Sequence, residues 1–561
     1  MRDYFTGRRL LSLWQHEFQG YDLHKFQRDL LAGVTVAAVA LPLALAFGVA
    51  SGATAAAGLV TAIVAGIVIA LLGGAPFQIS GPTGAMSAVL IVVSTRYGIE
   101  GVWTVSLLAG IILILVGIFK LGQIINFIPS SVITGFTSGI AVIIFVGQIG
   151  NLLGVEPIPG ENALLQLWEY LRFRETPNPS AVLLSLLVIV TMALWPSRFN
   201  ARFPGSLVAL ILATAVAAAF RLDVPTIGSI PQSIVLDERL TLATIPWHRI
   251  DELIGPALSV AALGAIESLL CGAVIGRQTS VKMDDIQELF AQGVGNMVVP
   301  FFGGVPVTAA IARSSVAVKS GAVTRLTGIV HGLMLLLAAQ VLAPVISRVP
   351  LAALGGVLAV TAWRMNEWKA IREIFRQRFS SEWLAFLITL VATAVLDLTQ
   401  AIILGVAFSA LVFVLQSSKA EIICKPISVE DMRKIGYELK CGGERILVVY
   451  VVGPLFFGTA HRFSKTLESL DAYDDIILSL RTVPLIDTTG MQAIAEFIKA
   501  HRARGRHVYV SGLAKPVREK LERGGIIAML GEERVFWSAD QAIVAADRRR
   551  AAQLQPNPSI A

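Results

Sequence analysis

Long apolar stretches separated by short polar ones run along the chain as far as about residue 416. No charged residue occurs between Leu30 and Thr95, and none occurs between Leu121 and Val155. A helix needs about 20 apolar residues to cross a membrane, so the first stretch is long enough for three crossings. Hydropathy predicts about 14 crossings, at approximately 30–51, 54–72, 82–94, 102–119, 132–152, 181–195, 205–220, 257–275, 287–302, 308–318, 324–346, 351–363, 383–397 and 399–416. The pattern indicates an α-helical polytopic membrane protein.

A glycine–proline motif occurs twice between these apolar segments. Leu71–Pro76 (LLGGAP) corresponds to Phe301–Pro306 (FFGGVP), 230 positions later. Divided seven and seven, the crossings place the two motifs before the third and the tenth. An odd number of crossings in each half makes the halves insert in opposite orientations. The sequence therefore predicts a 7+7 inverted repeat in a transport domain at about 29–416, with halves at about 29–220 and 250–416.

The segments upstream of the two motifs also correspond. Val36–Gly52 aligns without a gap on Val260–Gly276, which places Phe47 opposite Cys271 and Glu267 opposite a leucine. Two related halves that are interrupted at the same place are the sequence signature of a secondary transporter. The substrate of such a protein lies where the broken helices meet.

Basic residues gather in the loops of one predicted side. With an N-terminal segment 1–28 inside, the inner loops hold most of the lysines and arginines, and the long outer loops at about 153–180 and 221–256 are acidic. Lys and Arg collect on the cytoplasmic side of membrane proteins. Both termini are therefore expected in the cytoplasm, in a multi-pass protein of the inner (cytoplasmic) membrane. The net charge of +7 fits such loops better than a nucleic-acid surface.

The composition changes after Gln416. Charges become frequent, and short apolar runs at Ile446–Val452, Ile476–Leu480 and His507–Val510 alternate with helical patterns. This alternation predicts a small cytoplasmic α/β domain at 435–547, after a linker at 417–434. The tail 548–561 is expected to be disordered.

Several functions are excluded by what the sequence lacks. The three cysteines have no paired or metal-ligand spacing, so neither a disulfide framework nor a metal site is expected. No nucleophile triad, metal cluster or nucleotide loop is present. We therefore expect no enzyme activity, no cofactor and no nucleic-acid partner.

Residues that follow the two motifs are the first candidates for binding. If two short helices begin near the midplane, their N-termini direct free N–H groups and positive dipole ends at one point, which suits an anion. The alternatives are close packing by Gly and Pro, a capping role for Thr83, and an arginine side chain that snorkels to the membrane surface. The candidates are Ser80, Thr83 and Gly84 after the first motif, and Ala310, Ala312 and Arg313 after the second.

Glu267 is a carboxylate in the middle of an apolar segment. Such a residue faces the protein interior and is a functional candidate; burial disfavours its charged form, so it can carry a proton. Cys271 lies one helical turn later, and a thiol is a poor ligand for Na⁺. The pair favours proton coupling, and Phe47 could exclude water around the anion. The alternatives are a structural hydrogen bond for Glu267 and ordinary packing for Phe47.

Together these segments resemble the SulP family of anion transporters, the sulfate-permease family. The matching segments are Leu41–Phe47, Gln78–Gly84, Gly264–Gln278 and Phe301–Ser315, together with the C-terminal domain. The resemblance implies a fold like that of the uracil transporters, core and gate domains that move as an elevator, a homodimer and a cytoplasmic STAS domain. It also implies an anion between the third and tenth helices, near Phe47.

One departure from the family concerns the coupling ion. Sodium–bicarbonate members have an aspartate where this chain has Glu267, and a threonine near Cys271. The difference favours a proton over Na⁺.

Within the STAS-like region, Leu485–Gly490 contains a candidate regulatory site. The resemblance places Thr488, beside Asp487, at the residue that is phosphorylated in anti-sigma-factor antagonists. A phosphate there would lie at a helix N-terminus, which favours negative charge. The alternative is a capping box of Thr489 and Gln492.

The function expected is proton-coupled symport of a small anion, such as sulfate, bicarbonate or a dicarboxylate. A sodium-coupled bicarbonate importer is the first alternative. A membrane-tethered scaffold, in which the STAS domain binds a cytoplasmic protein partner, is the second.

Overall fold

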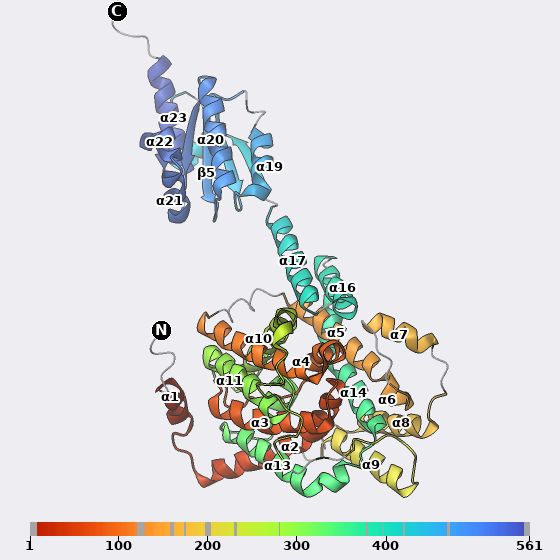
Figure 1. Cartoon of the computed structure of the whole chain (residues 1–561). Helices are drawn as coiled ribbons and strands as arrows, with labels where there is room; N and C mark the ends of the chain where they lie inside the picture. The colour runs from red at the N-terminus through yellow and green to blue at the C-terminus, as the bar shows by residue number, and fades with distance from the viewer. Residues whose placement is uncertain are drawn as a thin grey trace, which may run out of the picture. The chain divides into compact units, whose positions relative to one another are not determined.

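The computed structural model describes residues 8–120, 129–156, 162–172, 176–196, 203–228, 230, 233–279, 281–376, 380–396, 398–418, 421–441, 443–467, 470 and 472–554. The chain divides into two compact units, Met1–Ala407 and Phe408–Ala561. Figure 1 shows the first unit as a bundle of helices and the second as a sheet with helices around it.

The first unit is almost entirely helical. Its helices are α1 (Arg8–Glu17), α2 (Leu23–Ala50), α3 (Ala55–Leu72), α4 (Gly84–Ile118), α5 (Ser130–Gly147), α6 (Ile149–Leu153), α7 (Ala163–Arg172), α8 (Pro179–Leu194), α9 (Gly205–Ala219), α10 (Ile250–Thr279), α11 (Asp285–Val298), α12 (Ile311–Lys319), α13 (Leu326–Ile346), α14 (Leu351–Met365), α15 (Trp368–Arg376) and α16 (Ser380–Val395), and α17 (Leu398–Ser417) continues into the second unit. Two short strands complete it: β1 (Ser80–Gly81) and β2 (Thr308–Ala309).

Each predicted apolar range overlaps at least one of these helices. The third and fourth ranges lie in the single helix α4, which is interrupted at Gly98, where φ is 72°. Within the described residues, six helical stretches of 18 or more residues are apolar enough to cross a membrane, and several shorter ones are also apolar. The helical membrane fold is thus confirmed, and the number of crossings stays a prediction.

The helices of the first unit pack in two groups. In the core group, α4 packs on α10 and α11, and α13 packs on α2 and α3. In the gate group, α5 packs on α16, and α14 packs on α8. The groups meet where α4 contacts α5 and where α14 contacts α2. Each group therefore combines segments from both halves of the chain.

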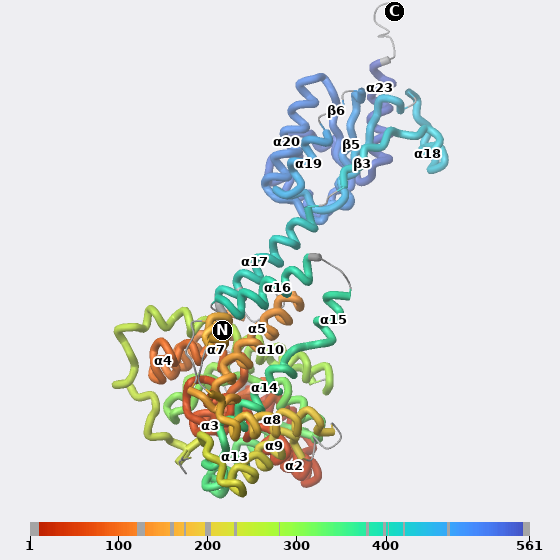
Figure 2. Tube along the Cα trace, turned by 90° about the vertical axis from the view of Figure 1, so that its right-hand side faces the viewer, coloured from red at the N-terminus to blue at the C-terminus, as the bar shows by residue number. Residues whose placement is uncertain are grey.

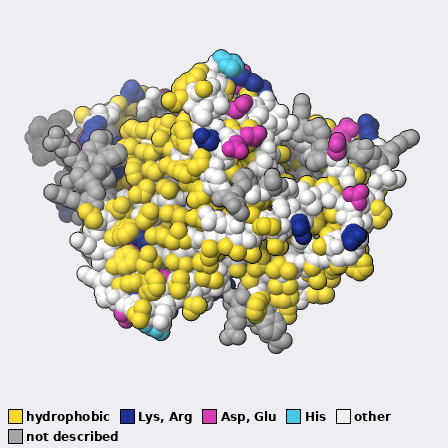
Figure 3. Space-filling view, turned by 60° about the horizontal axis from the view of Figure 1, so that its bottom comes forward, with side chains coloured by type: hydrophobic (Ala, Val, Ile, Leu, Met, Phe, Trp, Pro, Cys, Tyr) yellow, Lys and Arg dark blue, Asp and Glu magenta, His cyan; other side chains and the backbone are white. Residues whose placement is uncertain are grey.

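The outer surface of the first unit is rich in apolar side chains. Figure 3 shows a broad apolar area on one face, on which charged side chains are few. Exposed residues of α8 and α13 are examples: Leu183, Leu186, Val190 and Leu194, and Leu333, Leu337, Val341 and Val345. Such an extensive apolar surface is suited to lipid rather than water.

A five-stranded sheet forms the centre of the second unit, in the order β3-β4-β5-β6-β7. β3 is antiparallel to β4, and the other neighbours are parallel. The elements in chain order are β3 (Glu421–Pro426), α18 (Val429–Lys434), β4 (Ile446–Val452), α19 (Phe457–Leu467), β5 (Asp475–Thr482), α20 (Thr488–Ala503), β6 (His507–Ser511), α21 (Lys515–Arg523), α22 (Ile526–Leu530), β7 (Val535–Phe536) and α23 (Ala539–Leu554).

Apolar side chains alternate between the two faces of this sheet. Leu447, Val449 and Val451 of β4 pack in one core with residues of α19 and α20. Ile446 and Val448 pack in the other core with residues of α18 and α23. Figure 2 shows these two helix pairs on opposite sides of the sheet. A strand that is buried on both faces has apolar residues at successive positions, which explains why the sequence pattern predicted β4.

Two predicted boundaries of this unit were wrong. The predicted linker contains β3 and α18, since β3 supplies the antiparallel edge strand. Residues 548–554 of the predicted disordered tail are the last turns of α23, which the apolar pattern had not suggested because Arg548, Arg549 and Arg550 follow one another there. The rest of that tail lies outside the described residues.

Candidate functional site

The two glycine–proline breaks meet in the interior of the first unit. β1 pairs with β2 in antiparallel register, Ser80 opposite Ala309 and Gly81 opposite Thr308. α4 begins three residues after β1, and α12 begins two residues after β2. Because the strands run in opposite directions, the helices leave in opposite directions, and their N-terminal ends lie at the strand pair. The structure thus brings together the two polar segments that the repeat had singled out.

Each break is held by a helix from the other half of the chain. In the first break, the Gly74 N–H donates to Glu288 Oε2 of α11 at 3.0 Å. Gln292 Nε2 of the same helix donates to Glu288 Oε1 at 2.9 Å and to Ser80 Oγ at 2.8 Å. In the second break, the Val305 N–H donates to Thr61 Oγ1 of α3 at 2.7 Å. Each half of the chain therefore supplies a hydrogen-bond acceptor to the break in the other half.

Glu288 is a buried carboxylate that the sequence reasoning missed. Its side chain has no exposed surface, and it satisfies backbone N–H groups that the break leaves without helical partners. A signal was available, since Glu288 lies near the start of the predicted apolar range 287–302. A charged residue near the end of an apolar range is, however, usually read as interfacial.

Arg313 lies in the interior beside the strand pair. Its side chain is 2% exposed, and Nη2 donates to the Pro82 carbonyl at 2.9 Å. A Cβ atom on Gly81 would lie 2.5 Å from Nη1, so the guanidinium packs directly on the glycine backbone. Nη1 has no hydrogen-bond partner among the described residues. This burial contradicts the alternative that Arg313 snorkels to the surface.

Glu267 joins the site through Thr83. Thr83 Oγ1 donates to Glu267 Oε2 at 3.1 Å, and the same oxygen accepts from the Met86 N–H at 3.4 Å as the N-cap of α4. The capping role predicted as one possibility for Thr83 is therefore present, together with a contact to the candidate proton carrier. The hydrogen bond joins α10 to α4, as the structural alternative for Glu267 also expected.

Cys271 faces α12 rather than Glu267. Its thiol is buried and donates to Ser314 Oγ at 3.3 Å, and Ser314 Oγ accepts from the Ile79 N–H at 2.9 Å. Cys271 therefore supports the segment that leads into β1. Its hydrogen bond is to a serine that the sequence reasoning did not select.

Phe47 and Gly84 lie together at the first turn of α4. A Cβ atom on Gly84 would lie 3.2 Å from Phe47 Cε1, 3.1 Å from Met365 Sδ and 2.6 Å from Ile144 Cδ1. The last two residues belong to the gate group and were missed, since single apolar residues on apolar helices give no sequence signal. The N-terminus of α4 thus faces an apolar wall formed by both groups of helices.

The remaining predicted residues divide into two sets. Ala310 is the half-buried N-cap residue of α12, and Ala312 is exposed on the first turn of that helix. Asp487 and Thr488 lie in the second unit at the start of α20. Asp487 Oδ1 accepts from the Gly490 N–H at 2.8 Å and is the N-cap.

The capping-box alternative for Thr489 and Gln492 was therefore wrong. Asp487 occupies the cap position, and Thr488 is exposed on the first turn of the helix.

A membrane unit with two broken helices that begin at a shared strand pair, followed by an α/β unit, defines a class: secondary transporters with a STAS domain. The chain belongs to the sulfate permease family, whose family model matches residues 26–416, and the STAS domain model matches residues 442–542. The family consists of transporters, so the chain is not an enzyme.

Two relatives match nearly the whole chain. The putative sulfate transporter YvdB of Bacillus subtilis (strain 168) is 34% identical over 93% of this chain and 98% of its own length. The bicarbonate transporter BicA of Picosynechococcus sp. (strain ATCC 27264 / PCC 7002 / PR-6) is 29% identical over 92% of this chain and 94% of its own.

Solved structures show the same fold. The murine Solute Carrier 26 family member A9 anion transporter, in the inward-facing state, matches with a TM-score of 0.83 at 18% identity and covers 96% of this chain and 94% of its own. The transmembrane domain of a cyanobacterium bicarbonate transporter BicA matches with a TM-score of 0.63 at 31% identity, over 68% of this chain and 98% of its own.

Proposed function

We propose that this protein is a proton-coupled symporter of a small oxyanion such as sulfate, bicarbonate or a dicarboxylate. The observation that carries the proposal is the meeting of two helix N-termini beside the buried guanidinium of Arg313. Helix N-termini favour anions through unpaired N–H groups and the helix dipole. A buried positive charge with a free N–H group adds to this field and favours a negative partner.

Proton coupling is supported by the hydrogen bond between Thr83 and Glu267. An ionised Glu267 would repel an anion bound at the N-terminus of α4 and would also hold the Thr83 hydroxyl. Protonation removes the charge and weakens the hydrogen bond from the hydroxyl to Glu267, which makes the hydroxyl more available to the anion. Each ligand would therefore raise the affinity for the other, as thermodynamic coupling requires.

The two groups of helices support an elevator mechanism. Arg313, Glu267 and the strand pair all belong to the core group, whereas Ile144 and Met365 belong to the gate group. An apolar contact between the groups carries no directional bonds that would oppose sliding. We further propose the cytoplasmic membrane as the location, both termini in the cytoplasm, a homodimer and a cytoplasmic protein partner for the STAS domain.

A second candidate is a sodium-coupled bicarbonate importer, whose substrate, though not its coupling ion, is favoured by the similarity to the bicarbonate transporter BicA. The two candidates differ in what enters with the anion. Proton symport acidifies a liposome in the absence of Na⁺, whereas sodium symport requires Na⁺ outside and does not itself acidify.

The test is acidification inside proteoliposomes after addition of sulfate, fumarate or bicarbonate, with protein-free liposomes as the control for CO₂ leakage. Wild type is compared with Glu267→Gln, which keeps the size of the side chain and removes its charge. We expect anion-dependent acidification in wild type and at least about a tenfold loss in the variant. Entry of labelled anion without acidification would exclude proton symport.

A further inference from the structure

A cavity of about 1090 Å³ opens in the first unit at the end of α2 that is far from α1. Val49 and Ala50, the last residues of α2, are part of its wall. α2 has 28 residues, which corresponds to a length of about 42 Å. The cavity is therefore at the opposite end of α2 from its N-terminus, on the side away from the proposed cytoplasmic side.

The floor of this cavity adjoins the proposed anion site. Ser87 and Ile144 both line the cavity. Ser87 Oγ donates to the carbonyl of Thr83 at 3.0 Å and to that of Phe47 at 3.2 Å. Ile144 Cδ1 lies 2.6 Å from the position of a Cβ atom on Gly84. An ion that reaches this floor is one helical turn from the N-terminus of α4.

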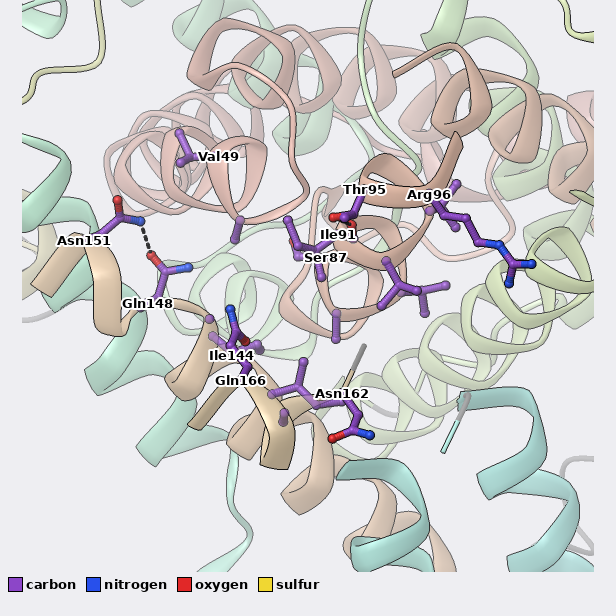
Figure 4. A pocket seen from close by; sticks show the side chains of 18 of the residues that line it. Val49, Ser87, Ile91, Thr95, Arg96, Ile144, Gln148, Asn151, Asn162 and Gln166 are labelled. Carbon is purple, nitrogen blue, oxygen red and sulfur yellow. Dashed lines mark hydrogen bonds between the residues drawn. The ribbon is translucent and has the colours of Figure 1, made fainter. Parts of the chain in front are cut away.

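Gln148, between α5 and α6, presents an amide group to the cavity. Its side chain is 4% exposed, and its Oε1 accepts from Asn151 Nδ2 at 2.9 Å. That bond sets the orientation of the amide, so that the two N–H donors of Nε2 point into the cavity, as Figure 4 shows. Within the described part of the chain, Nε2 has no hydrogen-bond partner. A donor that faces a cavity in this way is open to water or to a ligand.

The amide of Gln148 presents N–H donors to the cavity, and such donors suit an anion. The carbonyl oxygen of Gln148, which could bind a cation, is already engaged by Asn151. The charged residues of the lining are Arg96, Glu156 and Glu252, and Glu252 is paired with Arg249 at 3.3 Å. The wall around Gln148 therefore offers N–H donors without a strong net charge. Neutral donors can replace water around an ion and still release it, which transport requires.

We propose that Gln148 is an outer anion subsite, which binds the oxyanion before it reaches the N-terminus of α4. The proposal rests on the proposed function, since it presumes that an oxyanion is carried. Gln148 determines the affinity for anion that arrives through the cavity, and it has no part in the affinity for anion that arrives from the opposite side.

The test compares transport from the two sides of the membrane. Uptake of labelled sulfate, bicarbonate and fumarate is measured in right-side-out and in inside-out membrane vesicles. We expect Gln148→Leu to raise KM about tenfold for anion presented at the cavity side and to leave KM for the other side unchanged. Gln148→Glu, which has the same shape and keeps an acceptor for Asn151, raises KM at the cavity side further by repulsion. If the leucine variant fails to fold, the KM of Gln148→Glu at the cavity side shows whether Gln148 binds the anion.

Gln340→Leu is the matched control. Gln340 is exposed on α13 and does not line the cavity, so the same substitution there leaves both KM values unchanged. Wild-type transport with an unchanged KM in both Gln148 variants overturns the subsite alone. An equal rise of KM on both sides also overturns it, because it marks a structural role. Wild-type protein that carries none of the three anions overturns both proposals.

Discussion

Arg313 shows at the scale of one residue how the site depends on close packing. Its guanidinium lies on the backbone of Gly81 and is held by the Pro82 carbonyl. Only glycine leaves this space, so Gly81, which follows the first motif, does provide close packing, as the simpler explanation held. The packing also places a positive charge beside two helix N-termini. The structural and functional explanations of the motif are therefore compatible.

We expect Gly81→Ala to impair transport. The added Cβ would lie 2.5 Å from Arg313 Nη1 and 3.2 Å from Cζ, which forces the guanidinium away from the strand pair. Anion uptake in proteoliposomes should fall at least about tenfold, as is common when an electrostatic group is displaced by about 1 Å. Gly255→Ala, where a Cβ meets no atom within 4 Å, is the control. Equal uptake in the two variants would contradict a role for the position of Arg313.

At the scale of elements, each broken segment is stabilised from outside itself. A break leaves backbone N–H groups without helical partners, and in the membrane interior these must be satisfied by the protein. Glu288 of α11, itself held by Gln292, accepts from the Gly74 N–H in the first break, and Thr61 of α3 accepts from the Val305 N–H in the second. Asn296 of α11 also holds Val307 in the second break, so each break depends on at least one group from the other half.

Exchanging the two polar side chains of α11 tests this arrangement. In Glu288→Gln, the new amide N–H₂ group faces the N–H donor of Gln292, so that two donors meet in a buried position. We expect a loss of about 1–3 kcal/mol in stability, measured by thermal unfolding in detergent. The double variant Glu288→Gln with Gln292→Glu restores one donor and one acceptor and should recover most of the loss. A double variant no more stable than the single one would contradict the hydrogen-bond assignment.

For the molecule as a whole, the C-terminal unit extends beyond the boundaries that the pattern predicted. Arg549 of α23 donates to both oxygens of Asp475 in β5, at 2.8 and 3.0 Å. Asp475 has no exposed surface, and burial raises the pKa of its carboxyl group, whereas Arg549 opposes that rise. The last helix is thus bound to the central strand by an ion pair that lies beyond the predicted end of the domain.

Arg549→Met should therefore destabilise the C-terminal unit in a pH-dependent way. Removing the partner of a buried carboxylate costs about 2–4 kcal/mol where the partner is itself partly exposed. The substitution raises the pKa of Asp475 further in the folded state, so the folded state takes up a proton as the pH falls. The deficit relative to wild type is then largest near pH 8 and shrinks toward pH 5. This deficit in stability is measured as a loss of hydrogen-exchange protection in peptides from β5 of the full-length protein.

Arg548→Met is the control for this substitution. Arg548 is the exposed neighbour of Arg549, and no ion pair involves it among the described residues. Its substitution should leave protection unchanged at each pH, and a deficit of similar size in both variants would indicate a general effect on α23.

The sequence by itself determined the fold class, the division into a membrane part and an α/β part, and the two breaks. These features follow from hydropathy, from the periodicity of apolar residues and from the positions of Gly and Pro. Each of these signals depends on the transfer of side chains out of water or on the conformational preference of the local backbone. It also selected Thr83, Arg313 and Glu267, because polar groups in an apolar segment are conspicuous.

Only the tertiary structure decided which groups contact these residues. Glu288 and Gln292 support the first break, Ile144 and Met365 face Gly84, and Gln148 faces the cavity through its bond to Asn151. Most contacts of this kind join residues that are far apart in the chain, and the others depend on which side chains line the same cavity. Their energies depend on distances that no local pattern records, because folding brings the partners within hydrogen-bond reach only when all the helices have packed.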